Sequence, residues 1–133
     1  MRALVIILGI LGSALLPVLE LSKEETSEGR CVGEVKETPY SPAGMVVLVI
    51  DDLISRSDSK AEAVASLRRA GCLVRDCLVF LDREQGGSRA LVKLGVKLHS
   101  IASVSGTLAL YKDRDLITGQ QLSTILSYLR DSQ

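Results

Sequence analysis

Two adjacent carboxylates follow one of the most apolar stretches of this chain. Residues 46–50 form a run rich in β-branched side chains, and Asp51 and Asp52 come directly after it. Hydroxyl side chains then follow at Ser55, Ser57 and Ser59. Carboxylates in such a place can hold sugar hydroxyls or a divalent metal, and the amides of a helix start favour phosphate. The pattern therefore predicts a ligand site in which the helix start could bind a phosphate and the acids could bind sugar hydroxyls or a divalent metal.

The flanking residues predict the strand and the helix that would position these side chains. Residues 45–50 lack period-two alternation, which is typical of a parallel strand buried on both faces. A helical spacing of three and four residues follows in Ala63, Val64, Leu67 and Ala70, and Gly71 would end that helix. Ligands of open α/β sheets bind beyond the carboxyl ends of the strands. We therefore expect both acids at that edge, exposed, and replaceable without loss of the fold.

Two later motifs narrow the chemistry. Residues 77–87 read Cys-Leu-Val-Phe-Leu-Asp-Arg-Glu-Gln-Gly-Gly, and residues 96–101 read Val-Lys-Leu-His-Ser-Ile. With the acid pair, residues 46–133 resemble the orotate phosphoribosyltransferases, including that domain of uridine monophosphate synthase. The resemblance implies an α/β fold with a parallel-sheet, Rossmann-like phosphoribosyltransferase core that is truncated at its N-terminus. It also implies a glycosyltransferase of pyrimidine (UMP) biosynthesis, whose small-molecule substrates are phosphoribosyl pyrophosphate (PRPP) and orotate.

The resemblance assigns roles to individual residues of this sequence. Asp51 and Asp52 match the catalytic acids, which would hold the ribose hydroxyls and stabilise positive charge that develops as pyrophosphate leaves. Arg83 matches an arginine that contacts the pyrimidine. Mg²⁺ would arrive with the pyrophosphate, and no residue is assigned as a metal ligand. The loop that binds the 5′-phosphate would consist of Ser55, Arg56, Ser57, Asp58 and Ser59.

The N-terminal segment has two interpretations. Residues 3–17 are similar to the strand, pyrophosphate loop and helix that open the family's core, with residues 4–7 beside the strand at 46–50. The helix would place Leu15, Leu16 and Leu19 in the core, and the weakly matched pyrophosphate loop would comprise Leu11, Gly12 and Ser13. The alternative is a secretory signal peptide, since Arg2 precedes an apolar core that ends before Pro17.

The elements predict one domain over residues 1–133. Residues 1–22 would form the first strand and helix, residues 23–44 a connector without clear periodicity, and residues 45–133 the core. Short helices would follow at 104–111 and from Thr118. The last helix has an apolar stripe that predicts packing in the core or in a homodimer: Leu122, Ile125, Leu126 and Leu129.

Composition excludes several classes of function. The formal net charge of zero and the low aromatic content give no footprint for nucleic acid. The apolar N-terminal stretch is broken by Gly9, Gly12 and Pro17, so we expect no membrane anchor. The three cysteines lack metal-ligand spacing, and their odd number favours a reducing compartment. We therefore expect a cytoplasmic protein.

Several residues also have plain structural interpretations. Paired acids after a strand are often a solvated turn or a helix cap, Arg83 alone would be a surface charge, and His99 fits a structural hydrogen bond.

The sequence also departs from the family at Ser57, where glycine is usual, and at Asp58, a carboxylate beside the phosphate. It lacks the Lys- and Arg-rich lid loop and the hood over the base. The alternative function is a catalytically silent paralogue or truncated isoform that binds ligand or dimerises with an active enzyme.

Overall fold

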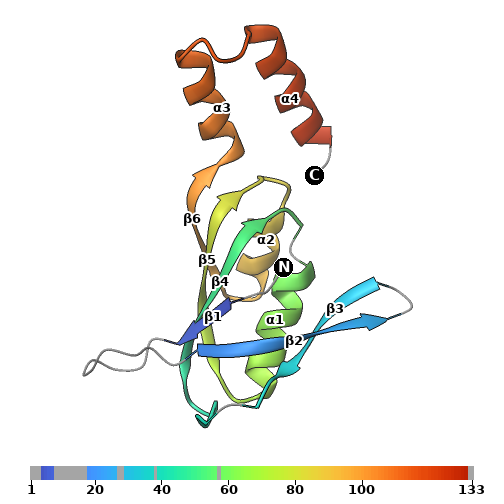
Figure 1. Cartoon of the computed structure of the whole chain (residues 1–133), viewed down its shortest axis with the longest axis vertical. Coiled ribbons are helices and arrows are strands. Elements are labelled where there is room, and N and C mark those ends of the chain that lie inside the picture. The colour runs from blue at the N-terminus through green and yellow to red at the C-terminus, as the bar shows by residue number, and fades with distance from the viewer. Residues whose placement is uncertain (1–3, 8–17, 27–28, 38, 57, 132–133) are drawn as a thin grey trace, which may run out of the picture.

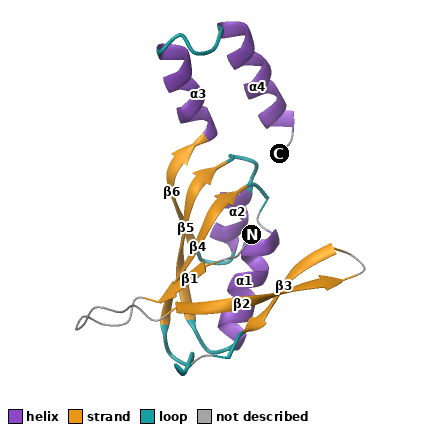
Figure 2. Cartoon of the chain, in the orientation of Figure 1, coloured by secondary structure: helices purple, strands orange, loops and turns teal. Residues whose placement is uncertain are grey.

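The chain forms a mixed α/β fold, seen here in a computed structural model (Figures 1 and 2). The structure describes residues 4–7, 18–26, 29–37, 39–56 and 58–131. Within these ranges the elements, in chain order, are β1 (Leu4–Ile7), β2 (Val18–Thr26), β3 (Gly29–Val35), β4 (Val46–Ile54), α1 (Asp58–Arg69), β5 (Leu73–Asp82), α2 (Gly87–Lys93), β6 (Lys97–Ser103), α3 (Val104–Asp113) and α4 (Gly119–Asp131).

The strands make one six-stranded sheet in the order β3-β2-β1-β4-β5-β6. β4, β5 and β6 are parallel, as the alternating strand and helix patterns predicted. β1 lies beside β4, which confirms the predicted pairing, and Leu4 is opposite Ile50. The expectation that β1 would extend the parallel sheet is wrong, because it runs antiparallel to both β4 and β2.

The helix predicted around Leu19 is also wrong. Residues 18–22 belong to strand β2, in which Leu19 and Leu21 are buried while Glu20 and Ser22 are half-buried. This period-two alternation places the leucines on one face of the sheet and the polar side chains on the other. Residues 8–17, which include Leu15, Leu16 and the proposed pyrophosphate loop, lie outside the described residues.

The connector predicted for residues 23–44 is largely a pair of strands. β2 continues to Thr26, and β3 returns antiparallel beside it, with Thr26 opposite Gly29 and Leu21 opposite Val35. The sequence here is charged because the two strands extend beyond the body of the sheet (Figure 1). The assignment of residues 1–133 to one domain stays a prediction.

The core lies between one face of the sheet and helices α1 and α2. Apolar side chains from β2, β4, β5, α1 and α2 meet there, and Leu19, Leu67 and Leu91 are fully buried. α1 ends where the sequence predicted, at Gly71, whose φ of 92° is the left-handed conformation that glycine adopts readily. The opposite face of β5 and β6 carries the exposed side chains of Phe80 and Ile101.

Helices α3 and α4 form a hairpin beyond the carboxyl ends of the parallel strands (Figure 1). α4 begins where predicted: the Thr118 hydroxyl accepts a hydrogen bond from the Gln121 amide, and the Gln121 side chain accepts one from the Thr118 amide. Of its apolar stripe, Leu129 is buried and Ile125 remains exposed. Among the described residues, no helix has both the length and the apolar character needed to cross a membrane.

Candidate active site

Strand β4 carries the acid pair near its carboxyl end, as predicted. Alternation along the strand directs Asp51 to the same face as the buried Val47 and Val49, toward α1. Asp52 points to the other face and is exposed. The two adjacent acids therefore occupy different environments: Asp51 lies between the sheet and α1, and Asp52 lies in solvent.

Asp51 is not exposed, which corrects the expectation from the sequence. Its side chain is 11% exposed and forms an ion pair with Lys60 of α1, whose side chain is 8% exposed. Burial acts to raise the pKa of Asp51, but the hydrogen bonds from Lys60 and from the Asp52 amide, together with the charge of Lys60, hold this pKa below its ordinary value. Asp51 is therefore a buried carboxylate, and removing it would strand a buried lysine.

Cys77 of β5 lies beneath this ion pair. Burial raises the pKa of the Cys77 thiol to about 11, with a smaller opposing influence from Lys60 and a reinforcing one from Asp51. Cys72 is also a buried free thiol, and burial raises its pKa. Both cysteines are therefore neutral packing residues.

The predicted phosphate loop connects β4 to α1. Ser55 is half-buried, Arg56 and Ser59 are exposed, and α1 begins at Asp58. Ser57 lies outside the described residues, and the side chain of Asp58 is not described. The loop thus delivers the amino end of a twelve-residue helix to the same edge as the acids, where its free amides can bind an anion.

The segment after β5 packs directly on this loop. The Arg83 amide donates to the Ile54 carbonyl at 2.8 Å, and the Gly87 amide donates to the Ser55 carbonyl at 3.0 Å. A Cβ atom on Gly87 would lie 2.5 Å from Cγ1 of Ile54 and 2.8 Å from the Ser55 carbonyl oxygen. Only glycine fits at this position without displacing its neighbours. The two backbone hydrogen bonds bring the acids, the phosphate loop and Arg83 to one edge of the sheet.

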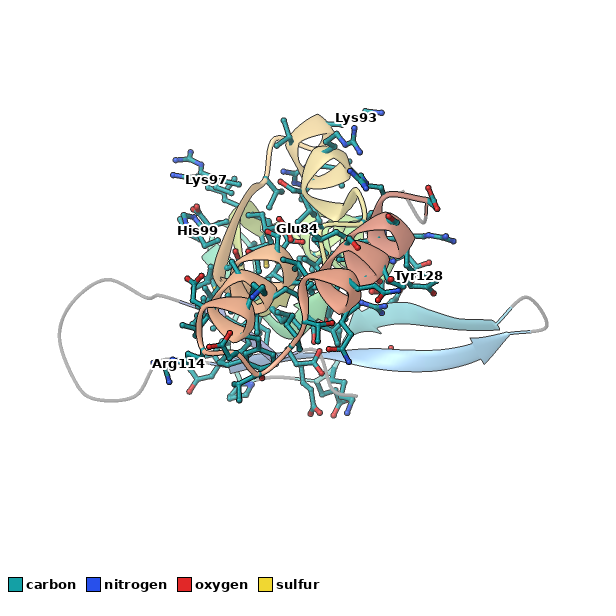
Figure 3. All side chains as sticks on the ribbon, turned by 90° about the horizontal axis from the view of Figure 1, so that it is seen from above. Glu84, Lys93, Lys97, His99, Arg114 and Tyr128 are labelled. Carbon is teal, nitrogen blue, oxygen red and sulfur yellow. The ribbon has the colours of Figure 1, made fainter. Side chains whose placement is uncertain are left out.

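Glu84 ties the same segment to α3. Its carboxylate accepts hydrogen bonds from the Ser105 amide at 2.7 Å and from the Ser105 hydroxyl at 2.8 Å. Glu84 holds a φ of 58°, and its amide donates to Asp82. Figure 3 shows Glu84 between the helices and the sheet. These hydrogen bonds link the Arg83 segment to the helical hairpin.

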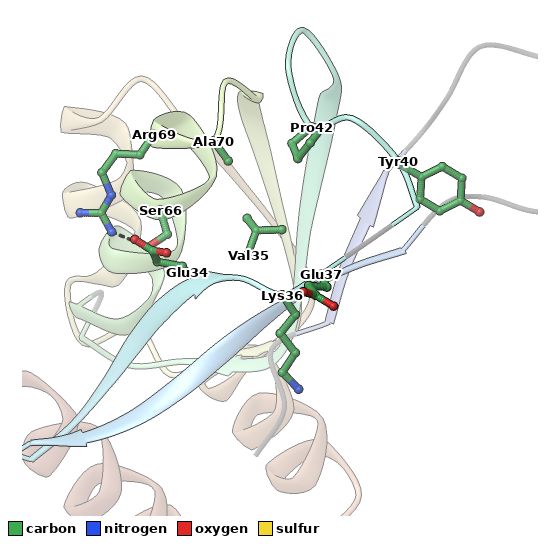
Figure 4. A pocket seen from close by; sticks show the side chains of 9 residues that line it. All are labelled: Glu34, Val35, Lys36, Glu37, Tyr40, Pro42, Ser66, Arg69 and Ala70. Atoms are coloured by element: carbon green, nitrogen blue, oxygen red, sulfur yellow. Dashed lines mark hydrogen bonds between the residues drawn. The ribbon is translucent and has the colours of Figure 1, made fainter.

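Other candidate features lie away from this edge. His99 bonds to Asp76 at 2.8 Å, the structural role expected for it. A pocket of about 490 Å³ lies between the end of β3 and the carboxyl end of α1, at the opposite edge of the sheet (Figure 4). Its lining includes Arg69, which donates to Ser66 and thus turns inward to its own helix. Leu11, Gly12 and Ser13 lie outside the described residues.

The chain is similar in sequence to known proteins. The orotate phosphoribosyltransferase of Saccharolobus solfataricus is 37% identical over 86 residues, 65% of this chain and 44% of that protein. In sequence the chain is similar to orotate phosphoribosyltransferases. Uridine 5'-monophosphate synthase of Bos taurus is 28% identical over 88% of this chain and 24% of its own length. No family model matches the chain.

The fold comparison agrees with the relationship to orotate phosphoribosyltransferases. The structure of Leishmania donovani UMP synthase matches with a TM-score of 0.63 and 31% identity, over 73% of this chain and 21% of that one. The chain spans less than half the length of the orotate phosphoribosyltransferase named above and about a quarter of the bovine UMP synthase. The likeness therefore supports an orotate phosphoribosyltransferase-like protein.

Proposed function

We propose that the chain binds PRPP at the carboxyl edge of β4 and transfers its phosphoribosyl group to orotate, which releases pyrophosphate. The observation that carries this proposal is the contact between the two loops: the Arg83 and Gly87 amides bond to the end of β4 and its phosphate loop. Asp52, the helix start and Arg83 then border one ligand site. The relatives named orotate phosphoribosyltransferase support the same reaction.

In the proposed reaction the protein contributes electrostatics and positioning rather than a nucleophile. Negative charge at the end of β4 stabilises positive charge on the sugar as the bond to pyrophosphate breaks, and the amides at the start of α1 hold the 5′-phosphate. Arg83 pairs with the carboxylate and carbonyl groups of orotate. A ring nitrogen of orotate forms the new bond to the sugar.

Mg²⁺ is proposed to enter with the pyrophosphate groups. Across the part of the chain that the structure describes, no cluster of three or more His, Cys, Asp or Glu side chains could hold a metal. The proposal agrees with the usual chemistry of Mg²⁺, which is commonly bound through substrate phosphates and one or two carboxylates. When bound, the cation would neutralise charge on the departing pyrophosphate.

The second candidate is a silent paralogue or truncated isoform that binds PRPP without turnover or dimerises with an active enzyme. Asp58 favours it, because a carboxylate at the helix start opposes a bound phosphate. Titration with PRPP and Mg²⁺, followed by an orotate-consumption assay, separates the two. Binding with turnover supports the transferase, binding alone supports the silent form, and no binding contradicts a PRPP site. We also propose that the chain forms a homodimer. Analytical ultracentrifugation would test this by measuring the molecular mass in solution.

Replacing Asp52 by asparagine should weaken PRPP binding at least tenfold, since one carboxylate hydrogen-bonding partner of the sugar is lost. Its thermal unfolding should not change, because Asp52 is exposed. Asp113→Asn, an exposed acid at the end of α3, is the matched control and should leave the affinity unaltered. Equal affinities for the wild type and Asp52→Asn would show that the acid is only part of a turn.

Replacing Asp58 by glycine should strengthen PRPP binding roughly fivefold, which corresponds to about 1 kcal/mol. The change removes a like charge beside the phosphate and frees the backbone there. Asp58→Asn removes the charge alone and separates the two contributions. Titrations at low and high salt provide the measurement. If neither variant binds more tightly at either salt concentration, Arg56 already offsets the acid.

A further inference from the structure

Lys60 is a buried lysine that the proposed reaction does not use. The whole residue is 6% exposed, in the first turns of α1, and it faces the sheet with the apolar residues Ala63, Val64 and Leu67. Lysine is almost never buried in this way unless a partner compensates its charge. That partner is Asp51, so the helix and the end of β4 are joined by an ion pair beneath the candidate site.

The hydrogen-bonding capacity of Asp51 is largely used within the protein. Its Oδ2 pairs with the Lys60 ammonium group, and its Oδ1 accepts a hydrogen bond from the Asp52 amide at 2.9 Å. In Asp52, Oδ1 accepts a hydrogen bond from the Leu53 amide at 2.8 Å. Asp52 is exposed to solvent. Only one of the two acids is thus available to a ligand in solvent.

Lys60 itself is poorly placed to bind a phosphate. Its side chain is 8% exposed and its ammonium group is committed to a buried carboxylate. Reaching an anion at the helix start would require breaking this pair and leaving Asp51 charged, unpaired and buried, which is strongly unfavourable. The exposed Arg56 is the cation of the loop that can reach a phosphate without such a cost.

We propose that Lys60 is a positioning residue that holds Asp51 beneath the edge of the sheet, so that Asp52 alone contacts the sugar of PRPP. The inference rests on the proposed function. It divides two adjacent acids between two tasks: Asp51 orders the end of β4 against α1, and Asp52 binds the ligand. Because the Asp51 and Lys60 charges cancel, the acid pair presents one net negative charge to the sugar rather than two.

A mutant cycle in the full chain tests this division of roles. The variants are Asp52→Asn, Asp51→Asn, Lys60→Met and the double variant Asp51→Asn/Lys60→Met. Each single change at Asp51 or Lys60 strands a buried charge, so the melting temperature should fall by roughly 10 °C or more. The double variant has no charge at either position of this pair. It should recover most of the lost stability and bind PRPP with Mg²⁺ to within tenfold of the wild type.

The affinity of the double variant separates positioning from direct contact. If Asp51 touched the sugar, the double variant would recover its melting temperature but bind at least as weakly as Asp52→Asn, which would overturn the inference. Additive losses of stability in the double variant would likewise overturn it, by showing no coupling between the two residues. A wild-type chain that binds no PRPP contradicts the proposed function instead, and the role of Asp52 with it.

Discussion

A variant that lacks residues 1–22 should be insoluble or should unfold without a cooperative transition. β1 lies between β2 and β4, so the deletion exposes the backbone of β4 along the four residues that pair with β1. It also removes residues 18–22 of β2, including Leu21, which lies opposite Val35 of β3. Leu19 and Leu21 leave the core, and each such burial contributes about 1.5–3 kcal/mol, against a total stability of about 5–15 kcal/mol.

Deletion of residues 114–133 is the matched control, since it removes a similar length of chain from the other end. That segment contains α4, whose main contacts among the described elements are with α3 rather than with the sheet. We expect this control to keep its cooperative transition, measured by circular dichroism during heating. A soluble, cooperatively folding variant without residues 1–22 would instead favour the signal-peptide interpretation and would remove residues 11–13 from the proposed site.

The parallel half of the fold could be predicted because its signals are local. The strand at β4 is a continuous apolar run, α1 repeats apolar residues at helical spacing, and Gly71 provides the left-handed residue that ends the helix. Each element therefore has its own pattern within a short window. The order of these patterns is that of parallel strands joined by helices, which fixes the carboxyl edge where the acids lie.

The N-terminal half could not be predicted in the same way, because its apolar residues fit two periods. Leu15, Leu16 and Leu19 have helical spacing, whereas Leu19 and Leu21 have strand spacing. The choice depends on a tertiary fact, namely that β1 runs antiparallel to β4 and offers its other edge to β2. Long-range pairing of this kind overrides local propensity and leaves no separate mark in the sequence.

Two periodicities in the sequence indicate the division between the two acids. Asp51 has the same parity along β4 as Val47 and Val49, so it had to face the helices. Lys60 stands three and four residues before Ala63 and Val64, on the stripe of α1 that faces the sheet. Together, the two periodicities indicate a buried ion pair. The sequence pattern does not give the distance between the Asp51 carboxylate and the Lys60 ammonium group, which the structure shows to be an ion pair.

The contact at Gly87 leads to the second large expected effect. Replacing Gly87 by alanine should lower the free energy of unfolding by about 2–3 kcal/mol, the upper part of the range for overpacking. The added Cβ would meet Ile54, which is fully buried, and the Ser55 carbonyl, which is backbone, so neither neighbour can move without shifting the loop. For a chain of this length the melting temperature should fall by roughly 10 °C.

Gly119→Ala is the control for Gly87→Ala, because a Cβ there lies 4.0 Å from the nearest atom, the end of the flexible Lys112 side chain. Alanine also favours helix over glycine, so this control should unfold at the same temperature as the wild type or slightly higher.

Gly87→Ala should also weaken PRPP binding at temperatures where it remains folded, because the Gly87 amide supports the Ser55 carbonyl of the phosphate loop. A destabilised variant with wild-type affinity would show that the contact between the two loops serves the fold alone. The hydrogen bonds from the Arg83 and Gly87 amides would then no longer support a ligand site at this edge.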